Sequence, residues 1–169
     1  MERDSKSPYR VLASGESNDA HHATAPHPEG LVARLAMERA LSAADLRWAD
    51  LGYLNAHGTG TVKNDAMESK AISQLNHENF KIAFSSTKDR TGHQLGAAGA
   101  SEAIFCLKAL EQEYLPPNAS LGNQSNALPA QPQLEEKGKL GQKIVMSNSF
   151  AFGGNNIALI LGISEPSPT

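Results

Sequence analysis

Apolar and polar positions alternate along the chain with two periods, one typical of strands and one typical of helices. Five short apolar runs predict strands, at 9–16, 51–56, 81–86, 143–149 and 155–161. Three longer segments carry apolar side chains at helical spacing and predict helices, at 31–41, 65–75 and 95–110. The order βαβαβαββ predicts an α/β fold with a mixed, mostly parallel sheet and helices packed on both faces.

The segment 95–110 is apolar on almost every side. Its polar residues are Ser101, Glu102 and Lys108, and its first turns are rich in Gly and Ala. A helix that is apolar nearly all round must be covered nearly all round. We therefore expect this helix to lie in a central layer between two sheets. The chain supplies one sheet, so a second half or another subunit is expected to cover the rest.

Length predicts one ordinary domain, since the chain has 169 residues and no internal repeat. We expect a flexible N-terminus at 1–8, the folded domain at 9–163 and a tail at 164–169. Residues 116–141 form a long polar connection between predicted elements.

Charge and composition exclude several classes of function. The net charge is −3 and no stretch is dense in Lys or Arg, which argues against a nucleic-acid-binding protein. No apolar run approaches the length of a membrane-spanning helix, and the first residues lack the apolar region of a secretory signal. The single cysteine, Cys106, excludes an internal disulfide and a cysteine-rich zinc site. These features are typical of a cytoplasmic protein.

Two histidines follow predicted strands. His57 lies in NAHGTGT (55–61) and His93 in STKDRTGH (86–93), together with Lys88. The carboxyl ends of strands are where α/β folds collect catalytic groups. His93 precedes the apolar helix, whose dipole disfavours the imidazolium, so we expect it to be neutral. Two neutral histidines suit the stabilisation of an anion derived from a carbonyl group.

The chain offers no evident nucleophile. No serine lies in a nucleophile-elbow pattern, and no acid is placed to complete a Ser-His-Asp set. Cys106 lies three turns into the apolar helix, where burial should raise the pKa of its thiol rather than lower it.

Several residues also have simpler interpretations. Asp65 and Glu68 have the spacing of a helix capping box, so Glu68 could be only a capping residue. Phe150 and Phe152 could be ordinary core residues. His21, His22 and His27 could suggest a metal site, but no carboxylate or cysteine completes a geometry, so a solvated or pocket-lining loop is favoured.

Three long motifs, in order, carry a resemblance to a known family. NAHGTGT, STKDRTGHQLGAAGASEAIF and SNSFAFGGNN (147–156) resemble the C-terminal half of β-ketoacyl-acyl carrier protein synthases, which are condensing enzymes of the thiolase superfamily. The likeness runs from about Tyr9 to Ile163. It implies a thiolase-like βαβαβαββ half, of which two build an αβαβα sandwich. It also implies decarboxylative Claisen condensation of a malonyl-carrier protein with an acyl thioester, through a Cys-His-His set.

The resemblance assigns roles to residues of this chain. His57 and His93 match the histidines that stabilise the enolate and the thioester oxyanion, Lys88 the lysine that orders the site, and Glu68 its acidic partner, with Asp65 also supporting the site. Phe152 matches a phenylalanine that gates the acyl pocket. The implied substrate-binding positions are Thr24, Thr59, Thr61, Phe150, Phe152, Gly153 and Gly154. The catalytic cysteine would belong to an N-terminal half that is absent here.

The resemblance also bears on partners and pathway. It implies acyl carrier protein as the partner that delivers phosphopantetheine, no cofactor of the chain's own, no metal, and an oligomer formed with an N-terminal half or a partner synthase subunit. The chain departs from the common motifs at Asn64, where Gly is usual, and at Asn155, where Thr is usual. These departures suggest a specialised branch of fatty acid or polyketide synthesis, such as one making polyenes.

A second function stays open at this point. The chain could be a non-catalytic companion that pairs with a synthase, as chain-length factors do, or a truncated inactive product. The presence of His57, Lys88 and His93 favours the catalytic interpretation, because a partner freed from chemistry has no physical need for them.

Overall fold

The computed structural model describes residues 7–76, 81–118, 127–134 and 139–163. Its strands are β1 (Tyr9–Asn18), β2 (Tyr53–Asn55), β3 (Ala83–Ser85), β4 (Ile144–Phe150) and β5 (Asn155–Ile163). Its helices are α1 (Leu31–Ala43), α2 (Val62–Leu75), α3 (Lys88–Thr91) and α4 (Ala98–Gln112), with 3₁₀ turns η1 (Trp48–Asp50) and η2 (Leu95–Ala97). The order of strands and long helices is the one predicted from the hydrophobic pattern. The expected tail and residues 1–6 lie outside the described residues.

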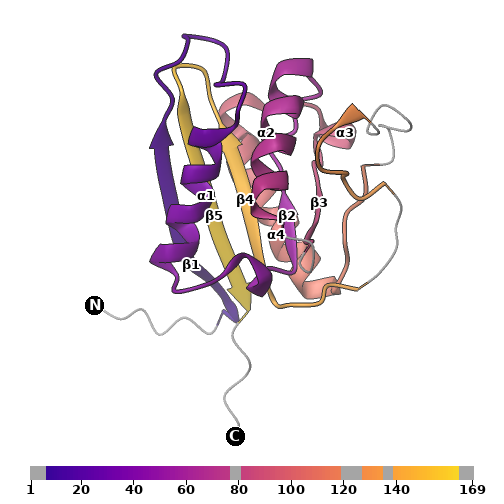
Figure 1. The fold of residues 1–169 in the computed structure, drawn as a ribbon. Coiled ribbons are helices and arrows are strands. Elements are labelled where there is room, and N and C mark those ends of the chain that lie inside the picture. Colours follow the sequence, from indigo (N-terminus) through magenta and orange to yellow (C-terminus); the bar gives the residue numbers. More distant parts are fainter. Residues whose placement is uncertain (1–6, 77–80, 119–126, 135–138, 164–169) are drawn as a thin grey trace, which may run out of the picture.

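The strands form one sheet in the order β1-β5-β4-β2-β3 (Figure 1). β2 pairs in parallel with both β3 and β4, whereas β5 pairs antiparallel with both β4 and β1. Only β5 therefore runs against the other described strands. This confirms the prediction of a mixed, mostly parallel sheet, and it brings the carboxyl ends of β2, β3 and β4 to the same edge.

Helices cover both faces of the sheet, but unequally. α1 and α2 pack together on one face, and α4 lies on the other (Figure 1). The contact between β1 and α1 is close enough to require a glycine: a Cβ at Gly15 would lie 2.2 Å from the backbone oxygen of Ala36 and 2.2 Å from the backbone nitrogen of Ala40. The two faces build two hydrophobic clusters, with Met37 and Ile160 in the first and Cys106 and Leu161 in the second.

Helix α4 is covered on one side only. Cys106, Ala109 and Leu110 are buried against β4 and β5, whereas Ile104 is 57% exposed. The expected α-helix over 95–110 begins three residues later, because Leu95 has a left-handed backbone (φ 52°) that an α-helix cannot include. The outer side of α4 is therefore the apolar face that the sequence predicted would need a further partner.

Helix α2 corrects the predicted capping box. The helix begins at Val62 after Thr61, and no side chain caps it. Asp65 consequently lies inside the first turn instead of preceding the helix, and Glu68 lies one turn deeper, where it is buried. Glu68 is thus free to act elsewhere than at the end of α2.

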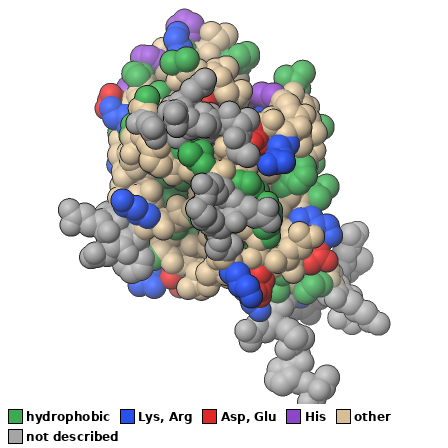
Figure 2. All heavy atoms as spheres, turned by 90° about the vertical axis from the view of Figure 1, so that its right-hand side faces the viewer, with side chains coloured by type: hydrophobic (Ala, Val, Ile, Leu, Met, Phe, Trp, Pro, Cys, Tyr) green, Lys and Arg blue, Asp and Glu red, His purple; other side chains and the backbone are tan. Residues whose placement is uncertain are grey.

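No helix in the described part of the chain is both long and apolar enough to cross a membrane. Figure 2 shows the β3 side of the molecule, where Lys and Arg side chains are scattered singly.

Candidate active site

The two predicted histidine loops meet at the carboxyl edge of the sheet. β2 and β3 are adjacent parallel strands, with Asn55 opposite Ser85, so the chain leaves both strands at the same height. His57 follows β2, and His93 follows β3 after the short helix α3. The two imidazole rings lie 5.3 Å apart between centroids and are nearly perpendicular. The structure therefore brings both sequence-predicted histidines into one site.

His57 is the buried member of this pair. Its side chain packs against Phe150, with ring centroids 5.6 Å apart. Burial, the nearby Lys88 ammonium and then His93 lower the pKa of His57 to about 3. Its ring is therefore neutral at physiological pH. Its Nδ1 atom is buried and has no hydrogen-bond partner among the described residues.

The depressed pKa of His57 makes stability depend on pH. Below about pH 6.5 the unfolded chain binds a proton on this residue that the folded chain excludes until about pH 3. The free energy of unfolding should therefore fall as the pH is lowered through this window, by about 2 kcal/mol between pH 6.5 and 4.5. Urea unfolding in dilute solution at the two pH values measures this loss. His57→Gln should remove that part of the pH dependence, and an unchanged slope in this variant would contradict the assignment.

His93 is exposed at the rim of the site. Its Nδ1 atom accepts a hydrogen bond from the backbone N–H of Leu95 at 3.1 Å. An Nδ1 atom that accepts carries no proton, so in the neutral ring Nε2 holds the hydrogen and can donate. The sequence placed His93 at the start of the long helix, but the turn η2 separates it from α4. The local hydrogen bond, rather than the end of α4, fixes its tautomer.

Lys88 opens α3 and is buried beside the histidines. Its ammonium contacts the Glu102 carboxylate on α4, and both side chains are almost fully buried. This corrects the expected pairing of Lys88 with Glu68. The segment 88–91, between the strand predicted at 81–86 and the helix predicted at 95–110, is a helical turn that aims Lys88 toward α4. Glu102 is the one acidic residue of the predicted apolar segment 95–110, so the sequence offered a signal for this partner.

Glu68 holds the backbone of the His57 loop instead. Its carboxylate accepts hydrogen bonds from the N–H of His57 at 2.9 Å and of Gly58 at 2.8 Å, and from the amide of Asn148 at 3.1 Å. Burial raises the pKa of Glu68, and these three bonds, followed by the nearby Lys88 charge, oppose the rise. Glu68 therefore supports the site by holding the backbone that positions His57. This role differs from both roles expected from the sequence, helix capping and an ion pair with Lys88.

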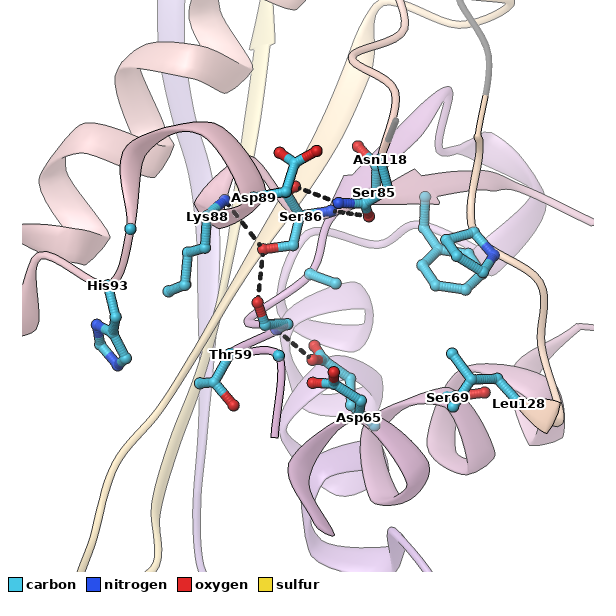
Figure 3. A pocket seen from close by; sticks show the side chains of 17 residues that line it. Thr59, Asp65, Ser69, Ser85, Ser86, Lys88, Asp89, His93, Asn118 and Leu128 are labelled. Atoms are coloured by element: carbon cyan, nitrogen blue, oxygen red, sulfur yellow. Dashed lines mark hydrogen bonds between the residues drawn. The ribbon is translucent and has the colours of Figure 1, made fainter. Parts of the chain in front are cut away.

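A pocket of about 220 Å³ lies beside these groups (Figure 3), and its lining includes the neighbours of His57, Ala56 and Gly58, but not His57 itself. Of the predicted site residues, its lining includes Lys88, His93, Thr59, Asp65 and Glu68. The hydroxyl of Thr59 lies 2.9 Å from that of Thr61, which precedes α2. The pocket also contains residues that sequence reasoning missed, among them Ser86 and Asn118.

The glycine-rich turn between β4 and β5 forms a separate part of the surface. Gly153 and Gly154 have φ angles of 81° and 82°, which L side chains rarely adopt. Phe152 at this turn is 79% exposed and is no core residue, whereas Phe150 is buried beside His57. None of these four residues lines the pocket described above.

Thr24 lies next to this turn, outside the pocket lining. The N–H of Gly153 donates to the carbonyl of Ala23 at 2.8 Å, and the N–H of Asp19 donates to the carbonyl of Gly154 at 2.7 Å. Thr24 itself is exposed. The structure therefore groups Thr24 with the glycine-rich turn and leaves its predicted contact with the substrate arm as a prediction.

The remaining candidates do not build a metal centre or a nucleophile. In the part of the chain that the structure describes, no three His, Cys, Asp or Glu residues are grouped so as to hold a metal ion. His21 and His27 contact each other, with ring centroids 5.0 Å apart. Cys106 is buried, and burial raises the pKa of its thiol to about 12, as the sequence predicted in direction.

Comparisons with known proteins identify the family of the chain. Residues 9–122 match the family model described as Beta-ketoacyl synthase, C-terminal domain. The chain is 42% identical over 154 residues to 3-oxoacyl-[acyl-carrier-protein] synthase 2 of Rhizobium meliloti, covering 89% of this chain and 36% of that protein. The chain thus spans little more than a third of the length of this relative.

Two solved structures show similar chains. One is the ketosynthase ApeO in complex with its chain length factor ApeC from Xenorhabdus doucetiae, with a TM-score of 0.86 and 49% identity over 95% of this chain and 40% of that chain. The other is AntDE:AntF, a type II polyketide synthase acyl-carrier protein in complex with its ketosynthase bound to the hexaketide. It has a TM-score of 0.81 and 26% identity over 93% of this chain and 39% of that chain.

Proposed function

The chain belongs to the beta-ketoacyl synthase family, as its C-terminal domain, and we propose that it supplies the oxyanion-stabilising part of a decarboxylating condensing site. The observation that carries this proposal is the pair formed by His57 and His93. One ring is buried and neutral, and the other presents an Nε2 donor at the mouth of the pocket. This arrangement suits an anion that develops on a thioester oxygen.

In the proposed reaction, a malonyl thioester loses CO₂ and the electron pair of the broken C–C bond forms an enolate. The two histidines donate hydrogen bonds to the enolate oxygen and so stabilise its charge. The enolate carbon then attacks the carbonyl carbon of an acyl thioester, a new C–C bond forms, and the thiolate of the acyl-enzyme leaves. The contact between Lys88 and Glu102 holds a positive charge close to His57, which helps to keep that ring neutral.

The nucleophile and the carrier come from outside the described chain in this proposal. We place the acyl-accepting cysteine in an N-terminal half, because Cys106 is buried with a raised pKa and the similar proteins are more than twice as long as this chain. Acyl carrier protein would deliver both thioesters on phosphopantetheine, so the chain needs no cofactor of its own. The cytoplasm is the proposed compartment. Whether the pathway makes fatty acids, polyketides or polyenes belongs to the same proposal.

The alternative function is that of a non-catalytic subunit that pairs with a synthase. It is considered because one similar structure contains a ketosynthase in complex with a chain length factor. A companion subunit needs the fold but no oxyanion donors. The chain places His57, Lys88 and His93 together with a buried acidic partner for Lys88. This polar cluster has a use in catalysis and none in a subunit that only pairs, so the catalytic role is favoured.

The proposal predicts that the chain alone forms no acyl-enzyme. Incubated with acyl-carrier protein and analysed by intact mass, it should gain no acyl group on Cys106, because a thiol with a pKa of about 12 is almost never a thiolate at neutral pH. With a matching N-terminal half and malonyl-carrier protein, a β-ketoacyl product should form. A mass increase mapped to Cys106, or no product from the combined halves, would contradict the proposal.

A further inference from the structure

Ser86 lies between the two histidine loops. Its hydroxyl donates a hydrogen bond to the carbonyl oxygen of Gly58 at 2.9 Å and accepts one from the N–H of Lys88 at 3.3 Å (Figure 3). The approach is tight, because a Cβ at Gly58 would lie 2.4 Å from the Cβ of Ser86. One buried hydroxyl therefore joins the loop that carries His57 to the loop that carries Lys88 and His93.

Asn118 holds Ser86 from the other side. Its amide oxygen accepts from the N–H of Ser86 at 2.7 Å, and its amide nitrogen donates to the carbonyl of Ser86 at 2.7 Å. Asn118 is itself buried. Its own N–H donates to the carbonyl of Gln133 at 2.6 Å, and the N–H of Gln133 donates to the carbonyl of Phe84 at 2.7 Å.

These bonds have a structural reason. Among the described strands β3 lies at the edge of the sheet, so no described strand pairs with the backbone beyond it. The two bonds of the Asn118 side chain replace that missing ladder at Ser86. The connection that follows α4 thereby fixes the point from which the Lys88 loop leaves the sheet.

We propose that Asn118 and Ser86 are positioning residues, a clasp that sets the distance between the His57 loop and the Lys88–His93 loop. This inference rests on the proposed function of the two histidines. Asn118 acts through Ser86, and Ser86 acts through the backbone of Gly58 and Lys88. Neither residue touches the reacting atoms in the proposed reaction.

Removing the clasp should loosen both loops at once. Ser86→Ala leaves the Gly58 carbonyl and the Lys88 N–H without their partner, at a cost that corresponds to about a tenfold change in a local opening equilibrium. Asn118→Ala should loosen the same loops, although Asn118 bonds only to the backbone of Ser86 at the start of the Lys88–His93 loop and makes no hydrogen bond to the His57 loop. This indirect effect separates a clasp from a simple local hydrogen bond.

Hydrogen exchange resolved to single residues tests the clasp in an intact synthase that contains this chain. In Ser86→Ala and Asn118→Ala, the amides of Gly58 and Lys88 should exchange about tenfold faster. Ser17→Ala is the matched control, because it removes a buried hydroxyl that donates to the carbonyl of Val32 at 2.6 Å, in the β1–α1 contact. The control should leave both loops unchanged. Equal acceleration throughout the chain, or acceleration at Lys88 but not at Gly58, would overturn the proposal.

Turnover in an intact synthase containing this chain tests the catalytic consequence. Both variants should lower kcat for decarboxylation of malonyl-carrier protein about tenfold with little change in KM, because substrate binding is retained while the donors are displaced. The double variant should be slower than either single variant, because Asn118 bonds to the backbone of residue 86, which Ser86→Ala retains. Unchanged kcat despite loosened loops would refute positioning. If the parent enzyme itself lacks decarboxylation, the proposed function fails, and the exchange data still decide whether the clasp exists.

Discussion

Replacing either His57 or His93 by alanine, in an intact synthase that contains this chain, should slow decarboxylation of malonyl-carrier protein by about 10²–10³-fold, the scale of one lost oxyanion donor. The two rings lie 5.3 Å apart, on the loops that follow the adjacent parallel strands β2 and β3. Each would supply one donor to the same developing charge, so neither can replace the other. Release of CO₂ from labelled malonyl-carrier protein measures the loss.

Two comparisons separate a catalytic role from a structural one. His21→Ala changes an exposed histidine on another loop and should leave decarboxylation unchanged. Acylation of the cysteine in the other half should suffer less than decarboxylation in both variants. Equal loss of acylation and decarboxylation in His57→Ala and His93→Ala would indicate that the histidines only maintain the fold.

The chain alone should self-associate, because its α4 side exposes apolar groups. Ile104 on α4 is 57% exposed, and Ile157 on β5, whose side chain alternates to the same side as Leu161, is 42% exposed. Val11, which pairs with Leu161 at the edge of the sheet, is 69% exposed. Soluble monomers rarely keep contiguous apolar patches larger than a few hundred Å². Light scattering should therefore report oligomers or aggregates, and a hydrophobic dye should fluoresce.

A matching N-terminal half should reverse this behaviour. Co-expression with that half should give a monodisperse particle with little dye fluorescence, because a second sheet would cover the outer side of α4. Ile104→Glu should weaken this assembly, whereas Lys63→Glu, an exposed change on α2, should not. A stable, dye-silent monomer of the chain alone would show that the face needs no partner.

Much of the architecture could be predicted from the sequence. Hydrophobic periodicity depends on the side chains of neighbouring residues, and it gave the order of strands and long helices correctly. The incomplete cover of α4 was predictable for the same reason, since an all-apolar helix cannot be satisfied by one sheet. Element ends were less certain. The first turn of α2 and the turn before α4 depend on backbone angles, such as the left-handed conformation of Leu95, that no hydrophobic pattern records.

The site likewise has features that the sequence predicted and features that only the structure shows. Placing His57 and His93 after strands was enough to expect them at one edge, because parallel strands end together. The partners of charged groups were decided only in three dimensions: Lys88 reaches Glu102 on α4, and Glu68 turns to the backbone of His57 and Gly58. Such contacts join different helices and loops, and the distance between these elements is set by tertiary packing, which the sequence pattern does not record. Asn118, 32 residues from Ser86, joins the site only because an edge strand lacks a neighbour and the returning chain supplies one.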